Sequence, residues 1–228
     1  MAPKGLFIAV EGGDGTGKTG AVGFLARSLS AKGAEVVATR EPGGTEEGLA
    51  LRKLLVSKTS LNWEPMSELL LITAARVQHV RATIGPALAS GKVVVCDRFV
   101  GSTLAYQGAG RGIPEATVWA LHEMAVGDLW PDLTIVIDAD PALALERSRK
   151  RLKAASLQEN RFEELDLAFH ARVRQAFREQ AIRHSGYVLI DGDRRELVVQ
   201  QDVLHAATTA VERWELKRDP LKRSPRQA

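Results

Sequence analysis

Short apolar runs recur along the chain, and segments with helical spacing separate them. A continuous apolar run of this kind is typical of a strand that is covered on both faces of a parallel sheet. The intervening segments carry apolar residues three and four positions apart, as in Ala21, Val22, Leu25 and Leu29, which indicates amphipathic helices. We therefore predict strands at residues 6–10, 35–39, 92–96, 133–138 and 187–190.

Helix signals fill the intervals between these runs. Pro114 and Pro141 suit the first turn of a helix, and Asp193 followed by Glu196 resembles a capping box. The alternation predicts an α/β fold, a five-stranded parallel sheet wrapped by helices, in one domain over residues 1–216. Helices are predicted from about residue 18 to 32, at 47–56, 65–90 and 114–127, after 140, at 162–184, and up to about 214.

The composition excludes several classes of protein. The 228 residues are 45% hydrophobic and 26% charged, as in an ordinary globular domain. We expect neither a membrane span nor a secretory signal, because no apolar run approaches the ~20 residues of a span and the first run stops at Glu11. Cys96 is the single cysteine, so no internal disulfide can form, and we expect a reducing, cytoplasmic setting.

Basic charge is concentrated at the carboxyl end of the sequence. Residues 217–228 hold five Lys or Arg and one Asp, a net charge of +4, whereas the whole chain carries +3. We expect residues 217–228 to form a solvated, poorly ordered tail. A nucleic-acid partner for that tail is the less favoured alternative.

The strongest motif follows the first strand directly. Residues 12–19 read G-G-D-G-T-G-K-T, which fits G-x-x-x-x-G-K-[ST] between a strand and a helix. Glycines let backbone N–H groups approach a triphosphate closely, Lys18 supplies charge for its phosphates, and Thr19 supplies a hydroxyl for Mg²⁺. An ordinary glycine-rich turn is the alternative. The predicted ATP-binding residues here are Gly12, Gly13, Asp14, Gly15, Thr16, Gly17, Lys18 and Thr19.

Two segments downstream allow more than one interpretation. Residues 40–45 form a loop with Pro and Gly at the edge where ligands bind in open α/β folds, and spacing alone leaves a ligand loop and a plain turn equally open. Arg76 interrupts the apolar helix predicted at 65–90. The residues alone favour an arginine that snorkels to water over one aimed at a ligand.

Polar residues also follow the third and fourth strands. Asp97 is placed to hold Mg²⁺ and Arg98 to bind a phosphate, the alternative being that Asp97 caps the next turn. Residues 102–112 have the composition of a Gly-rich loop, although Tyr106 and Gln107 carry groups that can contact a base or sugar. Cations within residues 146–161 suit either a lid over ATP or a solvated helix face.

Together these motifs resemble those of bacterial thymidylate kinases, over roughly residues 5–215. The phosphate loop alone is widespread, but R-E-P-G-G-T and A-Y-Q-G with D-R between them are far more specific. The resemblance implies a P-loop kinase fold with a lid at about 151–162, and transfer of the γ-phosphate of ATP to dTMP, giving dTDP. The shared elements are residues 11–19, 39–45, 74–76, 97–98, 105–108 with 111–112, and 131–134.

The resemblance also implies roles for individual residues. Asp14 would approach the sugar 3′-hydroxyl, and Tyr106 would pack against the deoxyribose. Arg161 matches the lid arginine that acts on the transferring phosphoryl group, and Arg151 matches the lid-helix arginine over adenine. The implied catalytic residues are Lys18, Asp14, Arg98 and Arg161; the substrate-binding residues are Asp14, Glu41, Ile72, Arg76, Arg98, Tyr106 and Gln107; and the metal ligands are Thr19 and Asp97.

Ile72 departs from the family, which usually has a stacking Phe there. Stacking of bases on aromatic side chains is worth about 1–3 kcal/mol where it has been measured, and Ile offers no π contact. A kinase for another nucleoside monophosphate is therefore the main alternative. A non-catalytic nucleotide switch is less favoured, because the chain has no Asn/Thr-Lys-x-Asp motif. The family forms homodimers, and we expect one here through helices 65–90 and 114–127.

Overall fold

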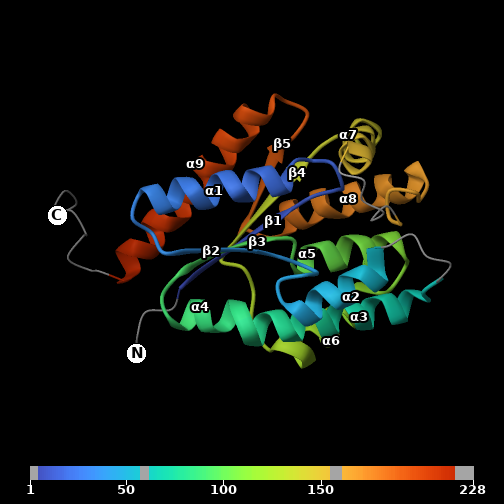
Figure 1. Cartoon of the computed structure of the whole chain (residues 1–228), viewed down its shortest axis with the longest axis horizontal. Helices are drawn as coiled ribbons and strands as arrows, with labels where there is room; N and C mark the ends of the chain where they lie inside the picture. The colour runs from blue at the N-terminus through green and yellow to red at the C-terminus, as the bar shows by residue number, and fades with distance from the viewer. Residues whose placement is uncertain (1–4, 57–61, 155–160, 219–228) are drawn as a thin grey trace.

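The computed structural model describes residues 5–56, 62–154 and 161–218. Within them, five parallel strands form one sheet in the order β2-β3-β1-β4-β5 (Figure 1). This confirms the predicted sheet, and the limits of each strand lie within one residue of the prediction. The strands are β1 (Leu6–Glu11), β2 (Val36–Arg40), β3 (Val93–Asp97), β4 (Leu133–Asp138) and β5 (Tyr187–Asp191).

Strand β1 is the centre of the sheet, and its apolar side chains alternate between the two faces. Ile8 and Val10 join the core beneath α1 (Lys18–Ala31) and α9 (Glu196–Arg218). Phe7 and Ala9 join the core on the opposite face. Every residue of β1 is buried. Since full burial of a large apolar side chain contributes about 1.5–3 kcal/mol, this strand anchors both layers.

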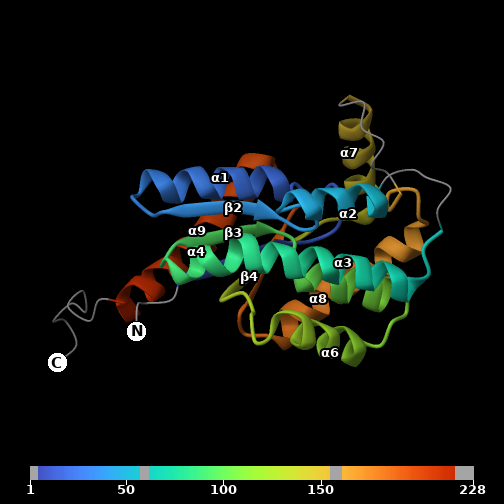
Figure 2. The same ribbon diagram turned by 60° about the horizontal axis from the view of Figure 1, so that its bottom comes forward.

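Helices cover both faces of the sheet (Figures 1 and 2). α1 and α9 pack on one face, while α4 and α8 pack on the other with α3 and α6 beside them. α7 projects away from the body of the molecule (Figure 2). No helix in the described part of the chain is both long and apolar enough to cross a membrane. The bounds are α2 (Glu46–Val56), α3 (Pro65–His79), α4 (Gly85–Ala89), α6 (Glu115–Val126), α7 (Pro141–Ala154) and α8 (Leu167–Arg183).

The parallel register gathers the carboxyl ends of the strands at one edge. Asp97 at the end of β3 lies opposite Val10 of β1 on one side and Arg40 of β2 on the other. Strand β1 has β3 on one side and β4 on the other, so the connections that leave β1 and β3 run to opposite sides of the sheet. Open α/β sheets bind ligands outside such a switch point. The fold therefore places the polar strand ends where a ligand would bind.

The helix predicted at residues 65–90 is one helical rod with a π-helical turn inside it. α3 continues into η1 (Val80–Ile84), and the N–H of Gly85 donates to the carbonyl of Val80, five residues back. Pro86 follows directly and has no N–H to give to the helix. The wider turn accommodates that missing donor and the bulk of the proline ring.

Residues 102–110 are helical and residues 111–112 form a turn, so the prediction of a loop over residues 102–112 is wrong for most of that range. α5 (Val100–Thr103) runs into a second π-helical segment, η2 (Leu104–Gly110). Ala105 and Tyr106 are buried against α8, and Leu104 packs in a cluster with α3 and α6. Burial against three helices outweighs the low helix propensity of the glycines. The segment thus holds Tyr106 and Gln107 on a packed helix.

Of the two helix starts predicted beyond β4, the one at Asp140 is confirmed and the one at Asp193 is wrong. The Asp140 carboxylate accepts hydrogen bonds from the N–H groups of Ala142 and Leu143, which confirms it as the cap of α7. The capping box of Asp193 and Glu196 is wrong, because the Asp193 carboxylate accepts from the N–H of Asp140 instead. α9 runs to Arg218, past its predicted end near 214, and the rest of the predicted tail lies outside the described residues.

Candidate active site

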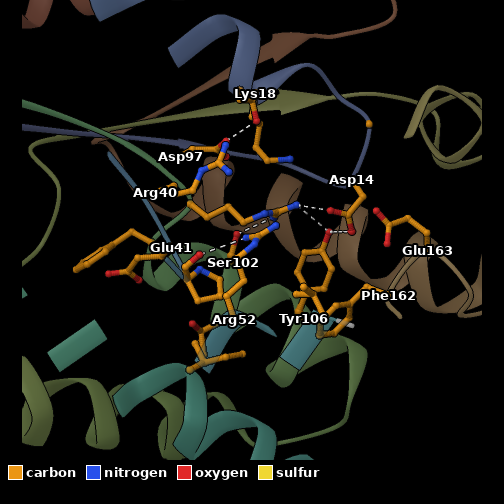
Figure 3. A pocket seen from close by; sticks show the side chains of 18 of the residues that line it. Asp14, Lys18, Arg40, Glu41, Arg52, Asp97, Ser102, Tyr106, Phe162 and Glu163 are labelled. Carbon is orange, nitrogen blue, oxygen red and sulfur yellow. Dashed lines mark hydrogen bonds and ion pairs between the residues drawn. The ribbon is translucent and has the colours of Figure 1, made fainter. Parts of the chain in front are cut away.

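A cavity of about 330 Å³ opens at the carboxyl edge of the sheet (Figure 3). That volume is within the range that holds small ligands. Gly12, Gly13 and Thr16 line a smaller hollow behind the phosphate loop. Arg161 lies outside the lining of both. The other predicted site residues line the cavity: Asp14, Gly15, Gly17, Lys18, Thr19, Glu41, Ile72, Arg76, Asp97, Arg98, Tyr106, Gln107 and Arg151.

The phosphate loop adopts a conformation that its glycines make possible. Gly12, Gly15 and Gly17 all have positive φ, with Gly17 directly preceding the first residue of α1. A Cβ on Gly15 would lie 1.7 Å from the carbonyl oxygen of Ala144, so α7 packs directly on the loop backbone. The amino end of α1 thereby points at the cavity, where its free N–H groups can bind an anion.

Lys18 is held inside this loop. Its Nζ donates to the carbonyl oxygen of Gly13 at 2.5 Å, and the residue is 6% exposed. Burial, together with the nearby Arg98 guanidinium, lowers the pKa of Lys18 to about 8. The ammonium group therefore lies in a site where an additional negative charge would be favourable.

Thr19 and Asp97 meet at the edge of the same cavity. The Thr19 hydroxyl donates to Oδ2 of Asp97 at 2.7 Å, joining the start of α1 to the end of β3. A hydroxyl and a carboxylate are the hard oxygen ligands that Mg²⁺ prefers. The pair is thus suited to hold that ion beside the phosphate loop.

Asp14, Arg98 and Tyr106 form a closed polar triangle. Arg98 donates to Asp14 Oδ1 at 2.7 Å and to the Tyr106 hydroxyl at 3.2 Å, and that hydroxyl donates to Asp14 Oδ2 at 2.7 Å. Burial alone would raise the pKa of Asp14, but the cations of Arg98 and Lys18 outweigh it and lower the pKa to about 2. Asp14 is therefore an anion placed between two cations.

Glu11, the last residue of β1, holds the backbone next to this triangle. Its place directly before the phosphate loop is the one feature of the sequence that points to this role. Its buried carboxylate accepts from the N–H groups of Phe99 and Ser102 and from the Ser102 hydroxyl. Ser102 Oγ in turn accepts from Arg98 at 2.9 Å. Burial raises the pKa of Glu11. Arg98, at φ 70°, is thus fixed by a backbone that Glu11 holds in place.

Arg76 does not reach water, so the favoured snorkelling interpretation is wrong. The residue is 2% exposed, and its Nε donates to Glu41 Oε2 at 2.8 Å. His79 approaches the other Glu41 oxygen at 3.0 Å. Arg76 and His79 outweigh the effect of burial and lower the pKa of Glu41. Of the two interpretations of residues 40–45, this supports the ligand loop, because Arg40 and Glu41 both line the cavity.

Gln107 and Arg161 converge on Glu68, a residue that the sequence did not single out. Gln107 Nε2 donates to Glu68 Oε1 at 2.8 Å, and Arg161 lies 2.8 Å from Glu68 Oε2. Arg161 also donates to the carbonyl of Leu55 at the end of α2. It therefore stays bound to the wall formed by α2 and α3, away from the phosphate loop.

Residues on both sides of the segment 155–160 form part of the cavity wall. Arg151 and Leu152 come from α7, and Phe162 and Glu163 follow the undescribed residues. Glu163 lies beside Asp14 in Figure 3, and burial followed by the Asp14 charge raises its pKa. The middle of the predicted lid, residues 155–160, lies outside the described residues.

Three features together define a P-loop phosphotransferase: a glycine loop ahead of a helix, a buried lysine at the end of that loop, and a hydroxyl–carboxylate pair that joins the helix to the end of β3. Comparison with known proteins narrows that class. The model of the thymidylate kinase family matches residues 10–203, and the chain therefore belongs to the thymidylate kinase family.

Named relatives agree with this family. The chain is 57% identical to a thymidylate kinase of Cereibacter sphaeroides over 192 residues, which cover 84% of this chain and 88% of that protein. It is 46% identical to a thymidylate kinase of Pelobacter propionicus over 190 residues, covering 82% and 87% respectively. The crystal structure of thymidylate kinase from Ehrlichia chaffeensis is similar with a TM-score of 0.70 and 32% identity, covering 92% of this chain and 99% of that one.

Proposed function

We propose that this cavity transfers the γ-phosphoryl group of ATP to the 5′-phosphate of dTMP, giving ADP and dTDP. One observation carries the assignment. Lys18 Nζ and Arg98 contact the carbonyls of Gly13 and Gly12, at 2.5 and 2.9 Å. Two cations, one from the start of α1 and one from the residue after β3, thus lie on consecutive peptide groups of the phosphate loop. This is the charge distribution needed to hold two phosphates end to end.

The donor end of the cavity is the phosphate loop. Backbone N–H groups of the loop and the start of α1 bind the phosphates of ATP, and Lys18 exchanges its contact with Gly13 for the β- and γ-phosphate oxygens. Thr19 and Asp97 are the residues that would hold Mg²⁺. Held there, the ion would supply positive charge that offsets the negative charge developing on the phosphate oxygens.

The acceptor end is the triangle of Asp14, Arg98 and Tyr106. Arg98 exchanges part of its contacts for the 5′-phosphate of dTMP, because a guanidinium suits a phosphate in bidentate geometry. Asp14 is freed to accept a hydrogen bond from the sugar 3′-hydroxyl, while the Tyr106 ring covers the deoxyribose. Arg76, Gln107 and Ile72 line the part of the cavity assigned to the base.

The chemical step needs no strong general base. The second pKa of a phosphate monoester is about 6, so dTMP is largely a dianion at neutral pH. One of its oxygens forms the new bond to the γ-phosphorus as the bond to the β-bridging oxygen breaks, and ADP leaves with that electron pair. Lys18, Arg98 and a lid arginine stabilise the charge spread over the transferring group. We assign that last role to Arg161, which must leave Glu68 to perform it.

An apolar surface supports a homodimer as the working assembly. Met66 and Leu70 on α3 and Met124 on α6 are 45, 50 and 84% exposed. α3 and α6 are in contact within the chain, so a two-fold partner can cover both. The single buried thiol, Cys96, supports a cytoplasmic location for this assembly.

A substrate panel tests the proposal. ADP formation is measured with dTMP, dUMP, dCMP, AMP and GMP as acceptors, each with ATP and Mg²⁺. We expect dTMP to have the highest kcat/KM. Because Ile72 lines the cavity where a ring would stack, another monophosphate is the second candidate, and equal rates with all five would contradict the assignment to dTMP.

A further inference from the structure

Glu68 is a buried carboxylate that ties three separate segments together. It lies in the first turn of α3 and is 0% exposed. Gln107 reaches it from the middle of η2, Arg111 from the turn after η2, and Arg161 from the segment after α7. Gln107 is the member of this cluster that also lines the cavity.

Among the described residues, each hydrogen bond or ion pair to the Glu68 carboxylate comes from a nitrogen donor. Gln107 Nε2 lies 2.8 Å from Oε1, Arg111 Nε lies 3.3 Å from the same oxygen, and Arg111 Nη2 lies 3.2 Å from Oε2. Arg161 Nη2 is the fourth nitrogen, at 2.8 Å from Oε2. A carboxylate with two guanidinium partners offers acceptors only. Its partners must therefore turn N–H groups toward it.

This fixes the orientation of the Gln107 amide. The oxygen and nitrogen of an amide can be exchanged by a half turn about the last side-chain bond, and the hydrogen-bond partners decide between the two positions. The half-turned amide would bring its oxygen against Glu68 Oε1, placing two acceptors together in a buried site. Nε2 therefore stays on Glu68, and Oε1 is the acceptor that this cavity-lining residue can offer to a ligand.

We propose that Glu68 is a positioning residue that sets which edge of a pyrimidine the enzyme accepts. With its oxygen fixed toward the ligand, Gln107 accepts from the N3–H of thymine or uracil. Cytosine has an acceptor at N3 and would leave two acceptors facing each other. This inference rests on the proposed function, because it takes the base to lie beside Gln107.

The relative kcat/KM for dTMP and dCMP tests the inference. In Glu68→Gln the new amide can present either its oxygen or its nitrogen, so Gln107 is free to turn. We expect the dTMP to dCMP ratio to fall at least about tenfold. Gln107→Ala should lower the ratio as well, and adding Glu68→Gln to Gln107→Ala should change it no further. Glu64→Gln is the matched control, one turn earlier on an exposed side chain, and should leave the ratio unchanged.

Equal losses on both substrates in Glu68→Gln would show that Glu68 only stabilises the fold, and would overturn the inference. If that variant does not fold, the wild-type protein still gives an answer. The side-chain ¹⁵N–H signals of Gln107, assigned by their absence in Gln107→Ala, should keep the downfield shift of a carboxylate-bonded amide when dTMP binds. Loss of that shift would contradict the inference. A wild-type enzyme that does not phosphorylate dTMP would instead refute the proposed function.

Discussion

Asp14 and Arg98 form an ion pair at 2.7 Å, although 84 residues separate them in the chain. Asp14 follows β1 and Arg98 follows β3, and the two strands are neighbours in the sheet. Their side chains are 20% and 16% exposed, so the pair is partly shielded from water. Parallel pairing thus places an arginine and its counter-charge beside the phosphate loop before any substrate arrives.

Replacement of Arg98 should lower the catalytic efficiency of the enzyme with dTMP. Arg98 contacts Gly12, Asp14, Ser102 and Tyr106 at once, through a planar guanidinium that Lys cannot imitate. We expect Arg98→Ala to lower kcat/KM for dTMP by roughly 10³ or more, and Arg98→Lys to recover only part of it. Steady-state kinetics with varied dTMP measure this. Arg172→Ala, an exposed arginine on α8, should behave as wild type, and a near-normal Arg98→Ala would refute the role.

Replacement of Arg161 should affect turnover more than binding. If Arg161 leaves Glu68 to act on the transferring phosphoryl group, it contributes in the transition state. We expect Arg161→Ala to lower kcat by roughly 10³ while KM for dTMP changes little, as in other phosphoryl-transfer enzymes that use such an arginine. Unchanged kcat would remove Arg161 from the mechanism and leave it as a structural partner of Glu68.

Lys18 should give the enzyme an alkaline limit. Its pKa is about 8 in the folded protein, below the usual 10.5, because burial disfavours the ammonium. The free enzyme therefore loses this charge as the pH rises through about 8, and the phosphates of ATP lose their cation. We expect kcat/KM for ATP to fall above about pH 8, measured roughly from pH 6 to pH 10. A flat profile across that range would contradict the placement of Lys18.

Glu41 should be important for stability as well as for the cavity. It is 4% exposed and pairs with Arg76, which is 2% exposed. Removal of one partner leaves a buried charge unpaired, which costs about 3–5 kcal/mol. We expect such a loss in the free energy of unfolding for Glu41→Ala, measured by urea denaturation. Glu35→Ala removes an exposed partner of Lys92 and should cost far less. Similar values for the two variants would show that the Arg76 pair is not important to the fold.

The five strands and the phosphate loop could be predicted because their signals are local, whereas the order of the strands in the sheet was not predicted. The apolar run Val93–Val95 is typical of a buried strand. The glycine spacing of the loop is the one needed to bring backbone N–H groups close to phosphates. Residues 102–112 could not be predicted in this way. Their helix depends on burial of Leu104 and Tyr106 against elements distant in the sequence.

The roles of Glu11 and Glu68 in the site could not be predicted from the sequence, because their partners are distant along the chain. Glu11 binds Phe99 and Ser102, which lie 88 and 91 residues away. Glu68 binds Gln107, Arg111 and Arg161, which lie 39, 43 and 93 residues away. Arg76 was misjudged for the same reason, since Glu41 is 35 residues away and makes its burial possible. The roles of buried charges depend on their tertiary partners, and spacing along the chain does not reveal those partners.

The central claim is that one cavity holds two phosphorylated molecules end to end between Lys18 and Arg98. Its most direct test uses an inhibitor in which a polyphosphate chain joins the 5′-oxygens of adenosine and thymidine. Because both halves then bind in one event, we expect inhibition that is competitive with ATP and with dTMP, and a Kd far below that of dTMP alone. Competition with only one of the two substrates would show that the donor and acceptor sites are not joined in this cavity, and would contradict the account.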